Sequence, residues 1–129
     1  MTSALILIVE DNEQNMKLVR DVLGHVGYRT LEAGDAELGI ELARTHRPDL
    51  ILMDVQLPGM NGMEALARLR SDSVTAELRV VAVTAFAMKE DRARILAAGF
   101  DGYLEKPLDV RAFPGQVSEL LAGVPGVAT

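Results

Sequence analysis

Three uninterrupted apolar runs constrain the fold of this chain more than any other feature of its sequence. They cover residues 5–9, 50–53 and 80–83 and read LILIV, LILM and VVAV. A strand with one solvent-exposed face alternates apolar and polar residues, whereas a strand that is buried on both faces does not. The runs therefore predict inner strands of a parallel sheet that has helices packed on both of its faces.

The segments between these runs have the spacing of amphipathic helices. Apolar side chains recur at intervals of three and four residues over residues 16–26, 36–43 and 63–69. This spacing puts them on one face of a helix, which then packs against the sheet. A further helix is expected from about Glu90 to Ala98.

Two weaker strands complete the pattern, at Tyr28–Ala33 and around Gly102–Glu105. Strands that alternate with helices in this way form a parallel sheet through right-handed crossovers. The sequence therefore predicts the α/β class, as a (βα)₅ doubly wound fold. Its five-stranded parallel sheet is expected to have the flavodoxin-like order 2-1-3-4-5.

One domain is expected to include almost the whole chain. The 129 residues suffice for a single core, and no linker or internal repeat interrupts them. We expect this domain to cover residues 1–122, a flexible tail to cover residues 123–129, and no output domain to follow. A final helix is expected to carry Val117, Leu120 and Leu121. It must start late or kink at Pro114, because proline lacks an amide proton and clashes inside a helix.

Charge and composition exclude several classes of protein. The chain has no cysteine, which excludes a disulfide framework and a thiolate metal site and favours a cytoplasmic location. Its net charge of −6 repels nucleic-acid phosphates, so we expect no direct nucleic-acid binding. The first apolar run meets Glu10 and Asp11 too early to form a signal peptide or to insert into a membrane.

Polar residues stand at the ends of four of the expected strands. Glu10 and Asp11 follow the first strand, Asp54 ends the third, Thr84 ends the fourth and Lys106 follows the fifth. Ligands of such sheets bind beyond the carboxyl ends of the strands, so these side chains should converge. A single acid there is usually just solvated, but clustered acids repel one another unless a cation is present, and few hard oxygen ligands suit Mg²⁺. The sequence therefore predicts a metal site for phosphoryl chemistry.

The motifs at these strand ends resemble those of two-component response regulator receiver domains over residues 4–122. They are VEDN at residues 9–12, LMD at 52–54 followed by PGMNG at 58–62, VTA at 83–85 and KP at 106–107. None of them is specific alone, but all occur in the expected order at the expected strand ends. The stretches at residues 9–17 and 81–89 are most similar to a single-domain cell-cycle regulator of this family and to the receivers of hybrid histidine kinases.

This resemblance implies a phosphorylation-dependent signalling switch. Asp54 would be the nucleophile that accepts a phosphoryl group from a histidine kinase or a histidine phosphotransfer protein. Lys106 and Thr84 would contact phosphoryl oxygens and stabilise the transition state. The chain would catalyse only its own phosphorylation and dephosphorylation, so it is not expected to be an enzyme with a separate substrate. Its output would be a contact with a downstream protein target.

The resemblance also implies which residues bind the metal. Asp11, the carboxylate of Asp54 and the backbone carbonyl of Gln56 would bind Mg²⁺, or Mn²⁺ in its place. Glu10 would reach the metal through water or from a second layer of contacts. The metal would neutralise charge as the phosphoryl group approaches an acid.

Three residues receive roles away from the metal. The resemblance implies that Tyr103 moves together with Thr84 as a switch, although a half-buried tyrosine at the sheet edge would look the same in sequence. Phe86 and Met88 are apolar where a loop is ordinarily polar, which indicates a partner-binding patch, unless Phe86 folds onto the sheet. The Lys106–Pro107 peptide bond is expected to be cis.

Two other functions compete with the switch. A metal-dependent phosphatase of the haloacid dehalogenase class also has an aspartyl nucleophile. In that class the nucleophile follows the first strand, and a second aspartate lies two residues after it. In this chain Asp54 is expected to end the third strand, and Gln56 takes the second position. A protein-binding module that needs no phosphorylation would usually lack part of the set of acids, threonine and lysine, all of which this chain has.

Overall fold

The apolar runs form the centre of a parallel sheet. The structure, a computed structural model, describes residues 4–85, 89–123 and 126–127. The strands are β1 (Leu5–Val9), β2 (Arg29–Ala33), β3 (Leu50–Asp54), β4 (Val80–Thr84), β5 (Gly102–Glu105) and β6 (Gly126–Val127). The helices are α1 (Glu13–His25), α2 (Ala36–His46), α3 (Gly62–Ser71), α4 (Lys89–Ala97) and α5 (Phe113–Leu121).

The sheet has the order β2-β1-β3-β4-β5-β6, and all of its neighbouring strands are parallel. The predicted fold class and the predicted order of the first five strands are therefore confirmed. The register sets Val9 beside Met53, Asp54 beside Val83, and Thr84 beside Glu105. The carboxyl ends of β1, β3, β4 and β5 consequently meet at one edge of the sheet.

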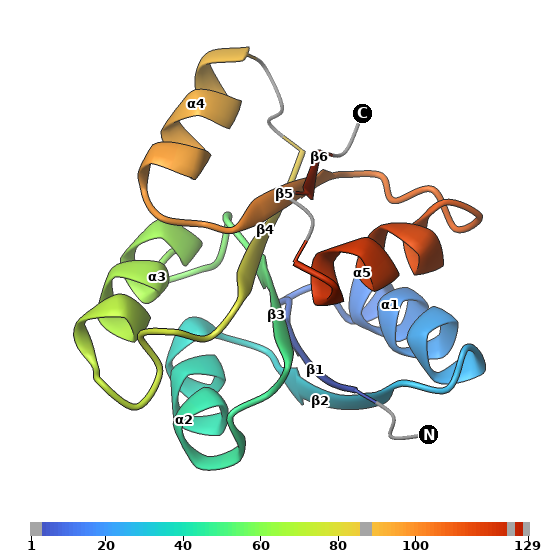
Figure 1. The fold of residues 1–129 in the computed structure, drawn as a ribbon, viewed down its shortest axis with the longest axis horizontal. Helices are drawn as coiled ribbons and strands as arrows, with labels where there is room; N and C mark the ends of the chain where they lie inside the picture. Colours follow the sequence, from blue (N-terminus) through green and yellow to red (C-terminus); the bar gives the residue numbers. More distant parts are fainter. Residues whose placement is uncertain (1–3, 86–88, 124–125, 128–129) are drawn as a thin grey trace.

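Helices cover both faces of the sheet, as a doubly wound fold requires. Figure 1 shows α1 and α5 on one side, and α2, α3 and α4 on the other. Every residue of β3 and of β4 is buried, which explains why their sequences do not alternate. The buried cluster consists mainly of aliphatic side chains from the strands and from the inner faces of the helices.

The helix ends follow from local sequence. The side chain of Asn12 accepts a hydrogen bond from the amide of Asn15 at the start of α1, and Gly27 follows that helix at φ +97°. In α3, Asn61 and Glu64 form a reciprocal capping box, which fixes the start of this helix just after β3. Helix α5 starts late, with Pro114 in its first turn where no amide proton is needed, as predicted.

The C-terminal end of α5 is capped by a side chain from another element. The Nη1 atom of Arg79 donates hydrogen bonds of 2.8 Å to the carbonyl oxygens of Leu120 and Leu121. These carbonyls lie in the last turn of the helix, where carbonyls lack helical partners. Arg79 directly precedes β4, so it ties the start of that strand to the end of the last helix.

Strand β6 is an addition that the sequence analysis did not predict. Its residues Gly126 and Val127 lie beside Gly102 and Tyr103 of β5. A pairing of two residues has no periodicity that a sequence could reveal. Strand β5 is therefore not the outermost strand of the described sheet.

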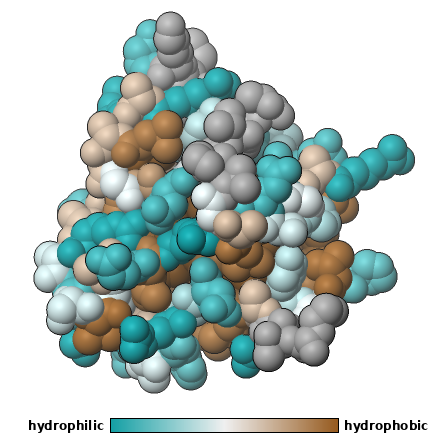
Figure 2. All heavy atoms as spheres, in the orientation of Figure 1, coloured by the Kyte–Doolittle hydropathy of each residue, from teal (hydrophilic) through white to brown (hydrophobic). Residues whose placement is uncertain are grey.

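The surface is mixed. Figure 2 shows hydrophilic side chains over much of the visible face, with small apolar groups between them. The large apolar side chains that are exposed come from several different elements: Leu18, Val26, Leu38, Val74, Leu96 and Val110. None of the helices in the described parts of the chain is long and apolar enough to cross a membrane.

Candidate metal centre

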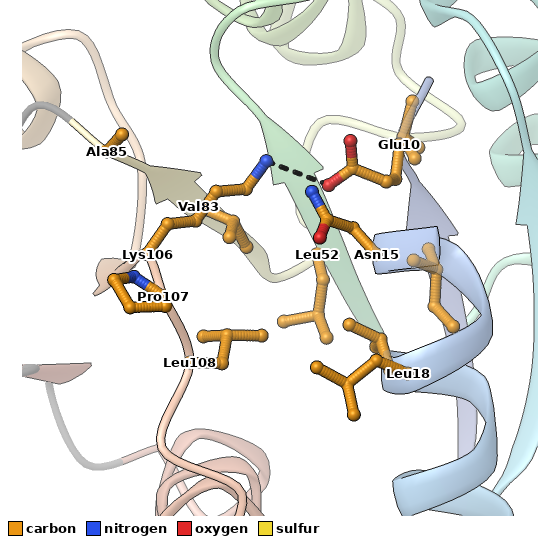
Figure 3. A pocket seen from close by; sticks show the side chains of 12 residues that line it. Glu10, Asn15, Leu18, Leu52, Val83, Ala85, Lys106, Pro107 and Leu108 are labelled. Atoms are coloured by element: carbon orange, nitrogen blue, oxygen red, sulfur yellow. Dashed lines mark ion pairs between the residues drawn. The ribbon is translucent and has the colours of Figure 1, made fainter. Parts of the chain in front are cut away.

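Two predicted acids meet a predicted lysine at the carboxyl edge of the sheet. Glu10 directly follows β1, Asp54 ends β3, and Lys106 directly follows β5. The Nζ atom of Lys106 lies 2.9 Å from Oε1 of Glu10 and 2.9 Å from Oδ2 of Asp54. Figure 3 shows Lys106 and Glu10 pointing toward each other. One ammonium group therefore bridges two carboxylates that arrive on different strands.

Asp11 adds a third carboxylate to this cluster. One oxygen atom from each of Glu10, Asp11 and Asp54 can be chosen so that all three lie within 4.8 Å of one another. Glu10 and Asp54 are buried, whereas Asp11 is exposed to solvent. Three carboxylates and one ammonium give a formal charge of −3 + 1 = −2. Hard oxygen ligands with this excess of negative charge suit a divalent cation such as Mg²⁺.

Backbone amides hold the two buried carboxylates in place. The amide of Asn12 donates a 3.1 Å hydrogen bond to Oε2 of Glu10, and the amide of Gln56 donates a 3.0 Å hydrogen bond to Oδ1 of Asp54. Each carboxylate is thus bound by Lys106 on one oxygen and by a backbone amide on the other. These contacts fix the orientation of both acids before any ligand arrives.

Burial and pairing shift the proton affinities of the cluster. Burial raises the pKa of Glu10 above its usual value, and the hydrogen bonds from Lys106 and Asn12 only partly offset this. For Lys106, burial acts to lower the pKa, but the hydrogen bonds to Glu10 and Asp54 outweigh it, and the pKa is raised. Lys106 therefore carries its positive charge at neutral pH.

Thr84 and Tyr103 lie on neighbouring strands, two residues apart in register. Thr84 is buried, and its carbonyl oxygen accepts a 2.8 Å hydrogen bond from the amide of Lys106. Tyr103 is paired with Ala82, two residues before Thr84 on β4, so the two side chains share one face of the sheet. The Tyr103 side chain is 3% exposed. It is therefore a buried residue and not a half-buried one at the sheet edge.

The remaining predicted site residues have different outcomes. Gln56 and Asp11 line the same surface hollow, together with Asn61. This position is compatible with a shared ligand, since the cluster lies next to the hollow. Phe86 and Met88, the predicted partner patch, lie outside the described residues. The Lys106–Pro107 bond is cis, as expected.

Gly62 has a role at this edge that sequence reasoning missed. A Cβ atom added to it would lie 2.5 Å from the backbone oxygen of Asp54 and 2.8 Å from the Cα atom of Val55. Its amide donates a 3.0 Å hydrogen bond to the carbonyl of Val55. Only glycine therefore lets α3 start this close to the end of β3. In the sequence it looked like an ordinary turn residue, because the close approach is visible only in three dimensions.

An apolar pocket beside Lys106 was also missed. It has a volume of about 350 Å³, and Figure 3 shows Leu18, Leu52, Val83 and Leu108 around it, with Lys106 and Glu10 at one end. Its walls come from α1, from three strands and from the segment after β5. No local motif could have indicated a pocket built from so many elements.

Comparisons with known proteins agree with this geometry. The model of the response regulator receiver domain family matches residues 6–117. The chain is 48% identical to the polar-differentiation response regulator DivK of Brucella anthropi over 108 residues, which are 84% of this chain and 88% of that protein. It is 47% identical to DivK of Brucella ovis over the same shares.

Solved structures give the same result. The chemotaxis protein CheY4 of Vibrio cholerae superimposes with a TM-score of 0.86 at 25% identity, covering 92% of this chain and 99% of that one. The receiver domain of the sensor histidine kinase PA1611 from Pseudomonas aeruginosa has a TM-score of 0.85 at 30% identity, covering 94% and 99%. That receiver holds a magnesium ion in its active-site cleft.

Proposed function

Because the chain belongs to the family of response regulator receiver domains, the phosphorylation-dependent switches of two-component signalling, we propose that Asp54 is the residue that becomes phosphorylated. The observation that carries this proposal is the position of Asp54. It ends the central strand β3, its carboxylate is buried, and Lys106 and the Gln56 amide each bind one of its oxygens. Glu10 has the same two kinds of contact, but it follows β1, whereas Asp54 ends β3 and lies beside β4, the strand that ends at Thr84.

The chemistry is the transfer of one phosphoryl group. A carboxylate oxygen of Asp54 forms a bond to phosphorus as the bond between phosphorus and the donor nitrogen breaks, which yields an acyl phosphate and a free histidine. The Nζ atom of Lys106 lies 2.9 Å from Oδ2 of Asp54, so it is positioned to contact a phosphoryl oxygen once Asp54 is phosphorylated. Thr84 ends the neighbouring strand β4, and we assign its hydroxyl to a second phosphoryl oxygen.

The acid cluster fits a divalent cation. We assign Asp11 and Asp54 as direct ligands of Mg²⁺, or of Mn²⁺ in its place, with the backbone carbonyl of Gln56 as a third ligand and Glu10 in support. A bound cation would neutralise negative charge as the phosphoryl group approaches the acids. The contribution of the protein is to hold these oxygens close together and to keep Lys106 charged beside them.

The proposal includes partners and location. We propose a histidine kinase or a histidine phosphotransfer protein as the phosphoryl donor, a downstream protein target as the receiver of the signal, and the cytoplasm as the place where both are met. Thr84 and Tyr103 form the switch that reports phosphorylation. Catalysis is limited to the phosphorylation and dephosphorylation of the chain itself.

The two competing functions have less support. A phosphatase of the haloacid dehalogenase class would need its nucleophile after β1 and a second aspartate two residues on, whereas Asp54 ends β3 and Gln56 takes that second position. A module independent of phosphorylation would usually lack part of the set of acids, threonine and lysine, whereas this chain has three clustered acids and a lysine paired with two of them. Neither agrees with the family match.

Intact-mass measurement tests the proposal. The protein is incubated with acetyl phosphate and Mg²⁺, and we expect a mass gain of one phosphoryl group that chelation of Mg²⁺ prevents. Asp54→Asn should abolish the gain, because an amide is a poor nucleophile of similar shape. Glu13→Gln, which alters an exposed acid in the first turn of α1, is the matched control and should retain it. Equal labelling of Asp54→Asn at another acid would refute the assignment.

A further inference from the structure

Helix α4 is connected to β5 by a contact between a cation and an aromatic ring. The Cζ atom of Arg92 lies 5.5 Å from the centroid of the Tyr103 ring. An arginine within about 6 Å of a ring centroid is attracted by the electron-rich face of the ring. The ring itself is buried, which strengthens the attraction because less water screens it.

Few of the described side chains of α4 are buried. Among the α4 side chains that the structure describes, only Ile95 is buried. Figure 1 shows this helix projecting beyond the other helices. The contact of Arg92 with Tyr103 is therefore a substantial part of what fixes the position of α4.

Strand pairing holds the backbone of Tyr103 on both sides. Tyr103 is paired with Ala82 of β4 on one side and with Val127 of β6 on the other. Thr84 lies two residues beyond Ala82, on the same face of the sheet. A rearrangement near Thr84 can thus be passed to Tyr103 by movement of the ring, while β5 stays in place.

We propose that Arg92 is a positioning residue that holds the Tyr103 ring in its buried place and thereby couples the position of α4 to the phosphorylation site. Strand β4 ends at Thr84 and α4 begins at Lys89, so the helix follows the switch residue closely in the chain. The contact of Arg92 with Tyr103 is a second connection between α4 and the sheet. Thr84 is thus connected to α4 along the chain, α4 to Tyr103 through Arg92, and Tyr103 to β4 through the pairing of β5 with β4. The coupling to phosphorylation rests on the function proposed above. The contact by which Arg92 holds the Tyr103 ring, which we call the clamp, does not.

The clamp is tested without phosphorylation. The chain has two tyrosines and no tryptophan, so Tyr28→Phe leaves Tyr103 as the only fluorescent phenol. In this background we compare Arg92→Gln with Arg94→Gln, which alters an exposed arginine of the same helix. Arg92→Lys is the conservative variant, because it keeps the positive charge that Arg92→Gln removes.

The readout is quenching of tyrosine fluorescence by acrylamide, with circular dichroism to verify folding. We expect the quenching constant to rise about two- to fivefold in Arg92→Gln, which corresponds to the lower range for such contacts, because Arg92 itself is partly exposed although the ring is buried. Arg94→Gln should match the parent protein, and Arg92→Lys should lie between. Equal quenching in Arg92→Gln and Arg94→Gln would overturn the clamp.

The coupling is tested by nuclear magnetic resonance with beryllofluoride and Mg²⁺ as a mimic of the phosphoryl group. In the parent protein the Ile95 methyl signals and the Tyr103 ring signals should shift together during the titration. In Arg92→Gln the Ile95 signals should lose at least half of their shift. If the signals of Ile95 shift fully in this variant, α4 is coupled by other contacts and the proposal is wrong. If neither protein responds, the proposed function itself has failed, and the quenching result on the clamp still stands.

Discussion

Replacing Gly62 with alanine would place a methyl carbon 2.5 Å from the backbone oxygen of Asp54 and 2.8 Å from the Cα atom of Val55. Real Cβ atoms do not approach other atoms this closely, and both neighbours are backbone atoms that cannot rotate away. The start of α3 would therefore have to move away from the end of β3. The amide of Gly62 also donates to the carbonyl of Val55 at 3.0 Å, so this movement would stretch a hydrogen bond.

The size of the effect follows from the packing. Insertion of a methyl group into a well-packed region costs about 1–3 kcal/mol, and the upper half applies because β3 is buried throughout. The better helix propensity of alanine returns less than about 1 kcal/mol. We expect Gly62→Ala to lower the free energy of unfolding by about 2 kcal/mol, or the melting temperature by roughly 6–10 °C for a chain of this size.

Urea denaturation and the rate of labelling by acetyl phosphate measure the two consequences. Both stability and labelling should fall, because the displaced backbone carries Asp54. Gly24→Ala is the matched control: Gly24 lies in α1, and no atom would lie within 4 Å of its new Cβ. That variant should be stabilised by up to about 1 kcal/mol and label normally. If Gly62→Ala were as stable as the parent protein and labelled at the same rate, the reasoning from this close approach would be refuted.

Three further predictions concern the charges of the site and the end of α5. Asp11→Ala should weaken Mg²⁺ binding at least tenfold by calorimetry, because an exposed ligand is lost while the fold remains, and an unchanged affinity would mean that the metal lies elsewhere. Lys106→Met should instead tighten Mg²⁺ binding, because Glu10 and Asp54 lose the ammonium group that is paired with both of them, and weaker binding would contradict this. Arg79→Met should lower the urea-measured free energy of unfolding by about 2 kcal/mol, because two carbonyls lose a charged donor, and it should leave labelling of Asp54 unchanged.

The sequence predicted those features that are encoded locally. Unbroken apolar runs at residues 50–53 and 80–83 indicated strands buried on both faces, and the position of Pro114 indicated a late start of the last helix. The convergence of Glu10 and Asp54 followed from sheet topology, since parallel strands bring their carboxyl ends to one edge. In each case a periodicity, a breaker residue or a known topology was sufficient.

The features that were missed depend on distances between elements. In the sequence, nothing distinguishes Gly62 from a turn glycine or Arg92 from the other charged residues of its helix. Their roles arise where α3 meets the end of β3 and where α4 meets β5. The pairing of Gly126 with Gly102 involves too few residues to leave a pattern. Such contacts are determined by how the elements pack, and packing between elements leaves no periodic pattern in a single sequence.

The ion pair between Lys106 and Glu10 joins the segment after β5 to the segment after β1, which are far apart in the sequence, and this has a consequence during biosynthesis. The acids of β1 and β3 leave the ribosome well before Lys106 does. Until β5 is added, burial of Glu10 and Asp54 would leave two negative charges without a cation, which is unfavourable by several kcal/mol. An unfinished chain is thus discouraged from closing its site and from consuming phosphoryl groups. The site can therefore close only after the segment beyond β5 that carries Lys106 has been synthesised.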